Sequence, residues 1–180
     1  QATGAHLLKG ECLLQLGQFQ AAQKSLDQGI AMAAKEQQLE LQAHGLYLKI
    51  RSQNLQERSH GASGGLLGQL ETLLSTPSLK ESQLQVYSRL LRTNASIEAH
   101  QFDEAKRQLA EARRWADQTK NPLASAWVSA VSGDLYHALK QPQLSLGDYI
   151  DAQQQARGLQ DPLFLGLLSN QIVNLYQEEQ

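Results

Sequence analysis

The sequence predicts an all-α protein made of stacked helical hairpins. Its commonest residues, Leu, Ala and Gln, lose little free energy on entering a helix, and its 180 residues include four prolines. Two prolyl turns, at 121–123 and 161–163, lie 40 residues apart, and the tetrapeptide at 133–136 has its counterpart at 173–176. Repetition at a spacing of about 20–50 residues is typical of repeat architectures. Such proteins usually offer surfaces for binding rather than pockets for chemistry.

Composition narrows the classes of function. The hydrophobic fraction of 41% is that of a folded chain rather than a disordered one. A net charge of -2 and a pI near 6.2 give no global attraction to nucleic acid or to an anionic membrane. No stretch approaches the roughly 18 uninterrupted apolar residues of a membrane-spanning helix. We therefore expect neither nucleic acid nor a membrane as a partner of this segment. The single cysteine is compatible with the cytoplasm, which is slightly favoured over the periplasm, and it does not exclude an exported protein.

The first helical pair has the clearest pattern. Leucines at helical spacing predict a helix over 3–16, Gly17 ends it, and a second apolar face predicts a helix over 19–35. Gly10 and Ala22 are small residues placed where two paired helices approach each other closely. The chain begins with Gln1 rather than Met and shows no signal peptide, so we expect a processed protein or a piece of a longer one.

Capping residues mark the later helices. Ser78 followed by Glu81 has the spacing of a capping box, which predicts a helix that begins at residue 79. Asn121 and Asp161 each precede a proline at the first helical position, where the missing N–H costs no hydrogen bond. With the apolar spacing, these signals predict first helices of each pair at 3–16, 39–56, 79–99, 122–139 and 162–179, and second helices at 19–35, 65–75, 102–119 and 142–157.

The second pair lacks a short turn. Its helices are separated by a segment at 59–65 that contains three glycines. These glycines follow a helix rather than a strand, and no Lys-Ser or Lys-Thr pair closes the motif. The segment is therefore expected to be a loop rather than a phosphate-binding site.

The first pair resembles the tetratricopeptide repeat. That family's pattern of small residues, a tight turn and an aromatic residue is matched by Gly10, Gly17, Phe19, Ala22, Leu26 and Gly29. The third pair repeats the pattern at His100, Gln101, Phe102, Ala105, Leu109 and Ala112, whereas the fourth has Pro142 at the aromatic position and Ser145 at the alanine. The resemblance implies a single all-α right-handed superhelix, an α-solenoid of about four and a half repeats at 1–38, 39–77, 78–120, 121–160 and 161–180.

The function implied by this resemblance is binding without catalysis. A period near 40 residues exceeds the family's usual length of about 34 and is similar to repeats of bacterial signalling proteins. We therefore expect a sensor or scaffold segment of a larger bacterial regulatory protein, which binds a peptide or a partner domain on its concave surface. Two alternatives are a sensor domain for a small-molecule effector and a module that self-associates through its last helix. No enzymatic activity and no cofactor are expected.

By resemblance, the first helices of the pairs line the binding groove. The position after each helix's small reference residue holds Glu11, Leu46, Asn94, Asp134 and Asn174, of which the last three are 40 residues apart. An amide at this place can donate to and accept from a peptide backbone. The Lys and Arg that accompany it in carboxylate-binding members of the family are missing here. Further groove candidates are Tyr87, Leu90, Trp127, His137 and Asn170.

The last helix is apolar over most of its circumference. A terminal repeat usually presents a polar outer face, so this helix is expected to contact a following repeat or a second copy of the chain. The residues expected at that contact are Phe164, Leu168, Ile172, Val173 and Tyr176.

Other candidate sites are excluded by spacing. The five histidines have no partner at metal-ligand spacing, so no metal site is expected. Cys12 lies among leucines, which predicts a buried and inert thiol. The basic stretch at 106–114 contains acidic residues at helical i,i+4 spacing, such as Asp103 with Arg107, so a salt-bridged outer face is expected rather than a nucleic-acid surface.

Overall fold

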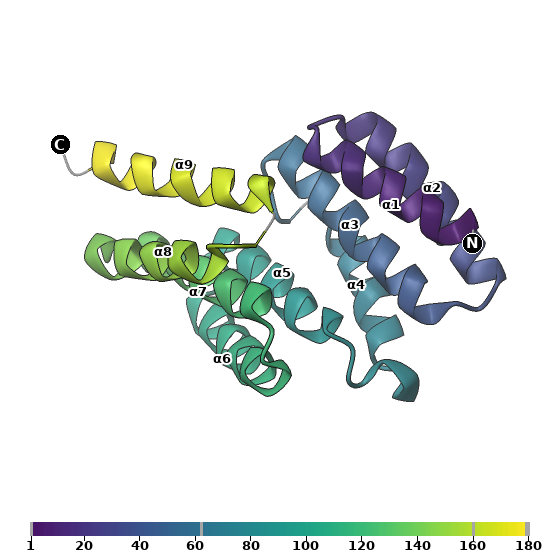
Figure 1. The fold of residues 1–180 in the computed structure, drawn as a ribbon. Coiled ribbons are helices and arrows are strands. Elements are labelled where there is room, and N and C mark those ends of the chain that lie inside the picture. Colours follow the sequence, from purple (N-terminus) through teal and green to yellow (C-terminus); the bar gives the residue numbers. More distant parts are fainter. Residues whose placement is uncertain (1, 62, 160, 179–180) are drawn as a thin grey trace. The chain divides into compact units, whose positions relative to one another are not determined.

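The computed structural model describes residues 2–61, 63–159 and 161–178, and in this part of the chain all regular secondary structure is helical, with no strand (Figure 1). The helices are α1 (Ala2–Gln15), α2 (Phe19–Lys35), α3 (Leu39–Glu57), α4 (Gly64–Leu74), a 3-10 helix η1 (Pro77–Leu79), α5 (Leu84–Glu98), α6 (Phe102–Thr119), α7 (Pro122–Ala138), α8 (Pro142–Ala156) and α9 (Pro162–Glu178). They fall into two compact units, Gln1–Leu91 and Arg92–Gln180. The all-α prediction is confirmed.

The predicted helix bounds agree with the structure to within one residue, with one exception and with residue 179 outside the described chain. The exception is α5, which begins at Leu84 rather than at residue 79. Pro77 opens a short 3-10 helix instead, and the chain makes a further turn before α5. Ser82, rather than Ser78, accepts a hydrogen bond at 3.3 Å from the backbone N–H of Leu84, while its own hydroxyl donates to Glu40 at 2.7 Å.

The other capping predictions are confirmed. The side chain of Asn121 accepts hydrogen bonds from the N–H groups of Leu123, at 2.9 Å, and Ala124, at 3.4 Å. The carboxylate of Asp161 accepts from the N–H of Phe164 at 2.9 Å. Both residues satisfy first-turn donors that a helix leaves without an intrahelical acceptor.

Several successive helices begin 20 residues apart, which is half of the 40-residue period seen in the sequence. In the first unit α2 begins at Phe19 and α3 at Leu39, and in the second unit α6, α7, α8 and α9 begin at positions 102, 122, 142 and 162. In four turns a glutamine N–H donates to the carbonyl five residues earlier, at 2.8–2.9 Å: Gln18 to Leu13, Gln38 to Ala33, Gln101 to Ser96 and Gln141 to Tyr136. The residue before each glutamine has a positive φ, from 55° at Gln37 to 71° at Gly17. These are Schellman-type helix ends, and their repetition gives the successive helices a common spacing.

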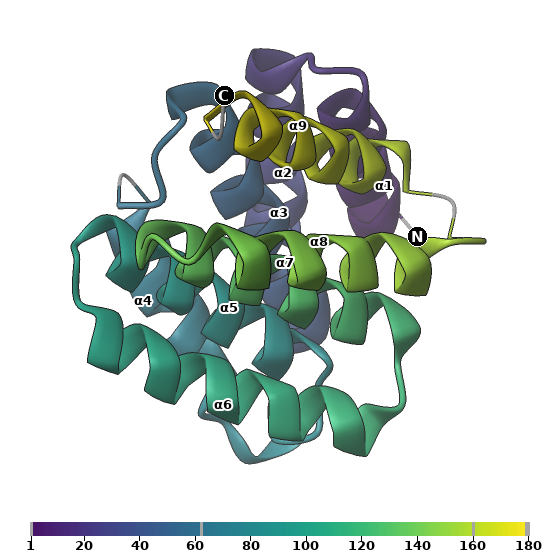
Figure 2. The same cartoon turned by 90° about the vertical axis from the view of Figure 1, so that its left-hand side faces the viewer.

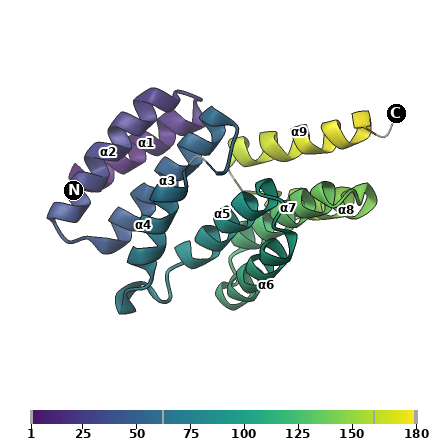
Figure 3. The same ribbon diagram turned by 180° about the vertical axis from the view of Figure 1, so that it is seen from behind.

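Close approach between paired helices depends on two glycines. A Cβ built on Gly10 would lie 2.6 Å from Leu26, and one built on Gly133 would lie 2.5 Å from Tyr149. Leu26 follows Gly10 at the same separation along the chain as Tyr149 follows Gly133, so the pairs α1–α2 and α7–α8 pack in the same way. Within its unit, α7 also contacts α6 (Figure 2), and α2 contacts α3 as well as α1 (Figure 3).

The glycine-rich segment between α3 and α4 is tied to α3 by one buried side chain. Asn54 accepts a hydrogen bond at 2.7 Å from the Ser63 hydroxyl, and its amide nitrogen lies 3.2 Å from Nδ1 of His60. Both Asn54 and Ser63 are buried. This contact replaces the short turn that joins the other helical pairs.

Candidate functional site: the surface of α7 and α9

Three side-chain pairs join α9 to α7 along their lengths. The rings of Trp127 and Phe164 lie 4.1 Å apart between centroids. Further along, Gln171 donates to Asp134 at 3.3 Å, and His137 Nε2 lies 2.8 Å from a carboxylate oxygen of Glu178. Because the three pairs follow the same order in both helices, α7 and α9 lie side by side and run in the same direction.

Asp134 is an acceptor shared by three helices. Its Oδ1 atom accepts a 2.6 Å hydrogen bond from the hydroxyl of Tyr149 on α8 and the bond from Gln171 on α9. Tyr149 is fully buried, and burial together with the nearby Asp134 carboxylate raises the pKa of its hydroxyl far above the ordinary tyrosine value. Asp134, singled out as a ligand-binding residue, is thus engaged in holding the second unit together.

The row of five groove positions is divided between the two units and is not uniform. Glu11 and Asn94 are half-buried, Asn174 is exposed, and Leu46 is buried. The position of Leu46 was counted from Gly45, which faces back towards Leu7 and Ile30 of the preceding pair.

Gly10 and Gly133, in contrast, each face the second helix of their own pair. Leu46 therefore does not share the position of Glu11 and Asp134, and it contributes to the core instead. A small residue can allow close packing either against the partner helix of its own pair or against the preceding pair. The sequence pattern alone did not distinguish these two interfaces.

The further groove candidates have different surroundings. In the first unit Leu90 is buried, and Tyr87 is half-buried with its ring 5.2 Å from that of Tyr47. In the second unit Trp127 and His137 are half-buried against α9, as described above, and Asn170 is exposed. Leu90 is thus a packing residue, whereas Asn170 is open to solvent.

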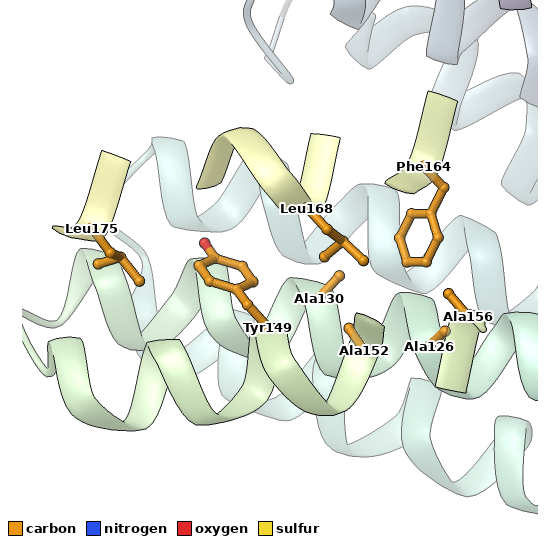
Figure 4. Close-up of a cluster of buried hydrophobic side chains, with 8 residues drawn as sticks. All are labelled: Ala126, Ala130, Tyr149, Ala152, Ala156, Phe164, Leu168 and Leu175. Atoms are coloured by element: carbon orange, nitrogen blue, oxygen red, sulfur yellow. The ribbon is translucent and has the colours of Figure 1, made fainter. Parts of the chain in front are cut away.

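The apolar face of α9 is mostly used within its own unit (Figure 4). Phe164, Leu168 and Leu175 are each at most 3% exposed and pack in one cluster with alanines of α7 and α8. Ile172 is half-buried against the same cluster. Phe164 and Leu168, expected to contact a following repeat or a second copy, therefore belong to the core of the second unit.

The outer face of α9 combines amides with apolar side chains. Val173 and Tyr176 are 51% and 53% exposed, and Asn170 and Asn174 beside them are exposed as well. Glu178 is the single charged residue in the sequence of this helix. We call Asn170, Val173, Asn174 and Tyr176 the α9 face. It offers hydrogen-bond donors, acceptors and apolar area without a side chain that is charged at neutral pH.

An open hollow of about 440 Å³ lies in the first unit over the turn between α1 and α2. Its lining residues are Gly17, Gln18, Phe19, Gln20, Ala21 and Gln56. The sequence had not indicated it, because its residues are ordinary turn and helix-end residues. With no charged or nucleophilic side chain in its lining, it offers backbone and amide hydrogen bonds only.

Two other sequence predictions are corrected. Cys12 is exposed rather than buried, because it lies on a face of α1 that no described helix of its unit covers. Arg107 pairs with Glu104 at 2.6 Å and Glu111 at 3.1 Å, not with Asp103. That hydrogen-bonded contact with Arg107 lowers the pKa of Glu104. The outer face of α6 is nevertheless salt-bridged at this point.

The described residues contain no group of three or more His, Cys, Asp or Glu side chains that could hold a metal ion. Among the same residues, no helix has the length and apolar character needed to cross a membrane. In comparisons with known proteins, the sequence matches no protein-family model and no curated protein.

Proposed function

We propose that this protein is a non-catalytic interaction module that binds a peptide or a partner domain through the α9 face. The observation that carries the proposal is the exposure of Asn170 and Asn174 next to Val173 and Tyr176 on one helix. Exposed amides can bond the backbone of a bound chain, while the apolar side chains beside them gain by losing contact with water.

The proposed site lies on α9 and does not include Asp134 and His137 of α7, which were predicted as groove residues. Asp134 is occupied by Tyr149 and Gln171, and His137 lies against Glu178. A ligand that used Asp134 would have to break a hydrogen bond inside the second unit, which is unfavourable because it leaves a buried polar group without its partner. Asn174, 40 residues later, is exposed, so a ligand could bind it without breaking such a hydrogen bond.

The proposal includes a tetratricopeptide-like right-handed solenoid. It is supported by the regular half-period spacing of helix starts, by the repeated Schellman turns, and by the equal placement of Gly10 and Gly133 against the second helix of their pairs. The 40-residue period supports a role as the sensor or scaffold segment of a larger bacterial regulatory protein. Repeat solenoids create extended concave surfaces that such proteins use for binding, which supports a binding role.

The test is a selection of displayed random peptides against the whole chain, followed by calorimetric titration of the selected peptides. We expect the double variant Asn170→Ala with Asn174→Ala to weaken binding at least roughly tenfold, since both amide contacts are lost. Gln118→Ala, at an exposed position of α6, is the matched control and should leave affinity unchanged. Selected peptides that bind the double variant as tightly as the original chain would place the site elsewhere.

Self-association is the second candidate function, because Val173 and Tyr176 leave apolar area exposed on α9. It predicts a mass that rises with concentration in sedimentation experiments and that Val173→Asp with Tyr176→Asp returns to the monomer value. Leu168 is unsuitable for this test, since it is 2% exposed and a charge there would disrupt the core.

A further inference from the structure

A second uncovered apolar surface lies at the other end of the chain, on α1. Ala5, Leu8 and Cys12 follow one another at helical spacing, and Leu16 continues the line just past the helix end. Leu8 is 62% and Leu16 71% exposed, and Ala5 and Cys12 are exposed as well. We call these four residues the α1 stripe.

The same positions are buried in α7. When the positive-φ turn residues Gly17 and Lys140 are matched, Gly10 falls on Gly133, as their packing requires. Ala5, Leu8 and Cys12 then correspond to Val128, Val131 and Leu135, which are at most 3% exposed.

The positions equivalent to Ala5 and Cys12 are also buried in α9 and α3. One 40-residue period after α7, Ala5 and Cys12 correspond to Leu168 and Leu175 of α9, which are 2% and 3% exposed. When the starts of α3 and α9 are matched, these positions fall on Gly45 and Ser52, which are buried too. The counterpart of Leu8 is buried in α3, as Leu48, and half-buried in α9, as Gln171. Ala5 and Cys12 of the α1 stripe are thus exposed where their counterparts in α3, α7 and α9 are buried.

In α3 and α9 this face covers the preceding helical pair. Gly45 of α3 packs on Leu7 of α1 and Ile30 of α2. In α9, Leu168 and Leu175 pack in one cluster with alanines of both helices of the preceding pair: Ala126 and Ala130 of α7, and Ala152 and Ala156 of α8 (Figure 4). In α9 the contact joins bulky side chains to small residues on two antiparallel helices, whereas in α3 the small Gly45 receives bulky side chains from both helices of the preceding pair.

We propose that the α1 stripe is a docking surface for an antiparallel helical pair of a partner protein, and that this pair presents alanines at its surface as α7 and α8 do. Helix α1 already packs against α2 and α3, and a helical pair bound at the α1 stripe would extend this row of packed helices on its other side. The proposal is independent of the α9 face, because the two surfaces share no residue.

A second copy of this chain is not the proposed occupant. Its pair α1–α2 is already covered by α3, and its pair α7–α8 by α9. Direct contact between two α1 stripes would bring together four small or medium side chains from each copy. Stable interfaces bury about 800 Å² per partner, usually from roughly 20–30 residues on each side.

The probe is a helical pair of known build, a copy of residues 121–163, joined directly to the start of the whole chain. This junction places Ala5 and Cys12 at the same separation along the chain from the copied α8 as Leu168 and Leu175 have from α8. Cys12 is the single cysteine of the sequence, so its alkylation by N-ethylmaleimide reports on the α1 stripe alone. We expect the added pair to slow this alkylation at least roughly tenfold, because thiol reactivity depends on access.

Two variants of the fusion make the result specific. Leu8→Asp in α1 should restore the alkylation rate of the fusion. The same change in the original chain should leave the helical content measured by circular dichroism unchanged, because Leu8 is exposed there. Gln28→Asp, at an exposed position of α2, should leave Cys12 protected.

Two outcomes would overturn the proposal. The first is a fusion with the added helical content but an unchanged alkylation rate, which would mean that the stripe does not accept such a pair. The second is a concentration-dependent dimer of the original chain that Leu8→Asp abolishes, which would assign the stripe to a second copy. Loss of peptide binding at the α9 face would affect neither readout.

Discussion

The hydroxyl of Tyr149 donates a 2.6 Å hydrogen bond to Oδ1 of Asp134, and this bond joins α8 to the row of positions that the 40-residue period defines. The same oxygen atom accepts from Gln171 of α9. The Asp134 carboxylate, which occupies a predicted groove position, therefore accepts hydrogen bonds that connect three helices. The equivalent residue one period later, Asn174, has no covering helix among the described residues and is exposed.

Replacement of Tyr149 by phenylalanine should destabilise the protein. The ring would still fill the space over Gly133, but Asp134 would lose the 2.6 Å hydrogen bond from the hydroxyl. Hydrogen bonds to charged groups contribute about 1.5–3 kcal/mol, so the free energy of unfolding in urea should fall by about that amount. Tyr176→Phe, at a residue that is 53% exposed, is the control and should change stability by less than about 0.5 kcal/mol. Equal effects of the two variants would contradict the role of this bond.

Stability should also decrease at alkaline pH because of Tyr149. Burial, together with the charge of Asp134, raises the pKa of this hydroxyl in the folded state. As pH rises through about 10, the unfolded chain therefore loses the proton while the folded chain keeps it, and the difference in bound protons favours unfolding. The contribution is fully present below about pH 10 and is lost above it. Thermal unfolding measured across this range should show a weaker alkaline decline in Tyr149→Phe than in the original chain.

Gly133→Ala should disrupt the α7–α8 pair. A methyl group there would lie 2.5 Å from the ring of Tyr149, which is fully buried and cannot move aside without disturbing the core. Overpacking of this kind costs about 1–3 kcal/mol in unfolding free energy. Gly147→Ala is the matched control on α8, where no atom lies within 4 Å of the new Cβ. That change should stabilise the protein by about 0.5–1 kcal/mol, because alanine is the better helix former.

Asn121→Ala should weaken the start of α7. The variant leaves two N–H groups, those of Leu123 and Ala124, without their acceptor. Loss of an N-cap side chain costs about 1 kcal/mol, which chemical unfolding can resolve. Asn121→Ser keeps a capping oxygen and should recover most of the loss. If serine and alanine destabilise the protein equally, the capping bond does not contribute to stability.

Local signals in the sequence were sufficient for most of the secondary structure. Asn121 and Asp161 are caps followed by proline, and such a pair specifies a helix start without reference to the rest of the chain. The start of α5 was missed because two competing signals lie close together. Ser78 has capping-box spacing, but Pro77 opens a 3-10 helix, and the contact of Ser82 with Glu40 of α3 accompanies the later start.

What the sequence by itself determined about this protein is its all-helical character, the position of nearly every helix and the repeat that orders them, because spacing, capping and turn chemistry act over a few residues. Tertiary structure alone decided which face of each helix is covered. Leu175 and Cys12 hold equivalent positions in the repeat, in apolar segments of their helices, yet one is buried and the other exposed. The difference is set by whether a helical pair precedes the helix in space, and that information is carried by neighbouring helices rather than by the residue's own pattern.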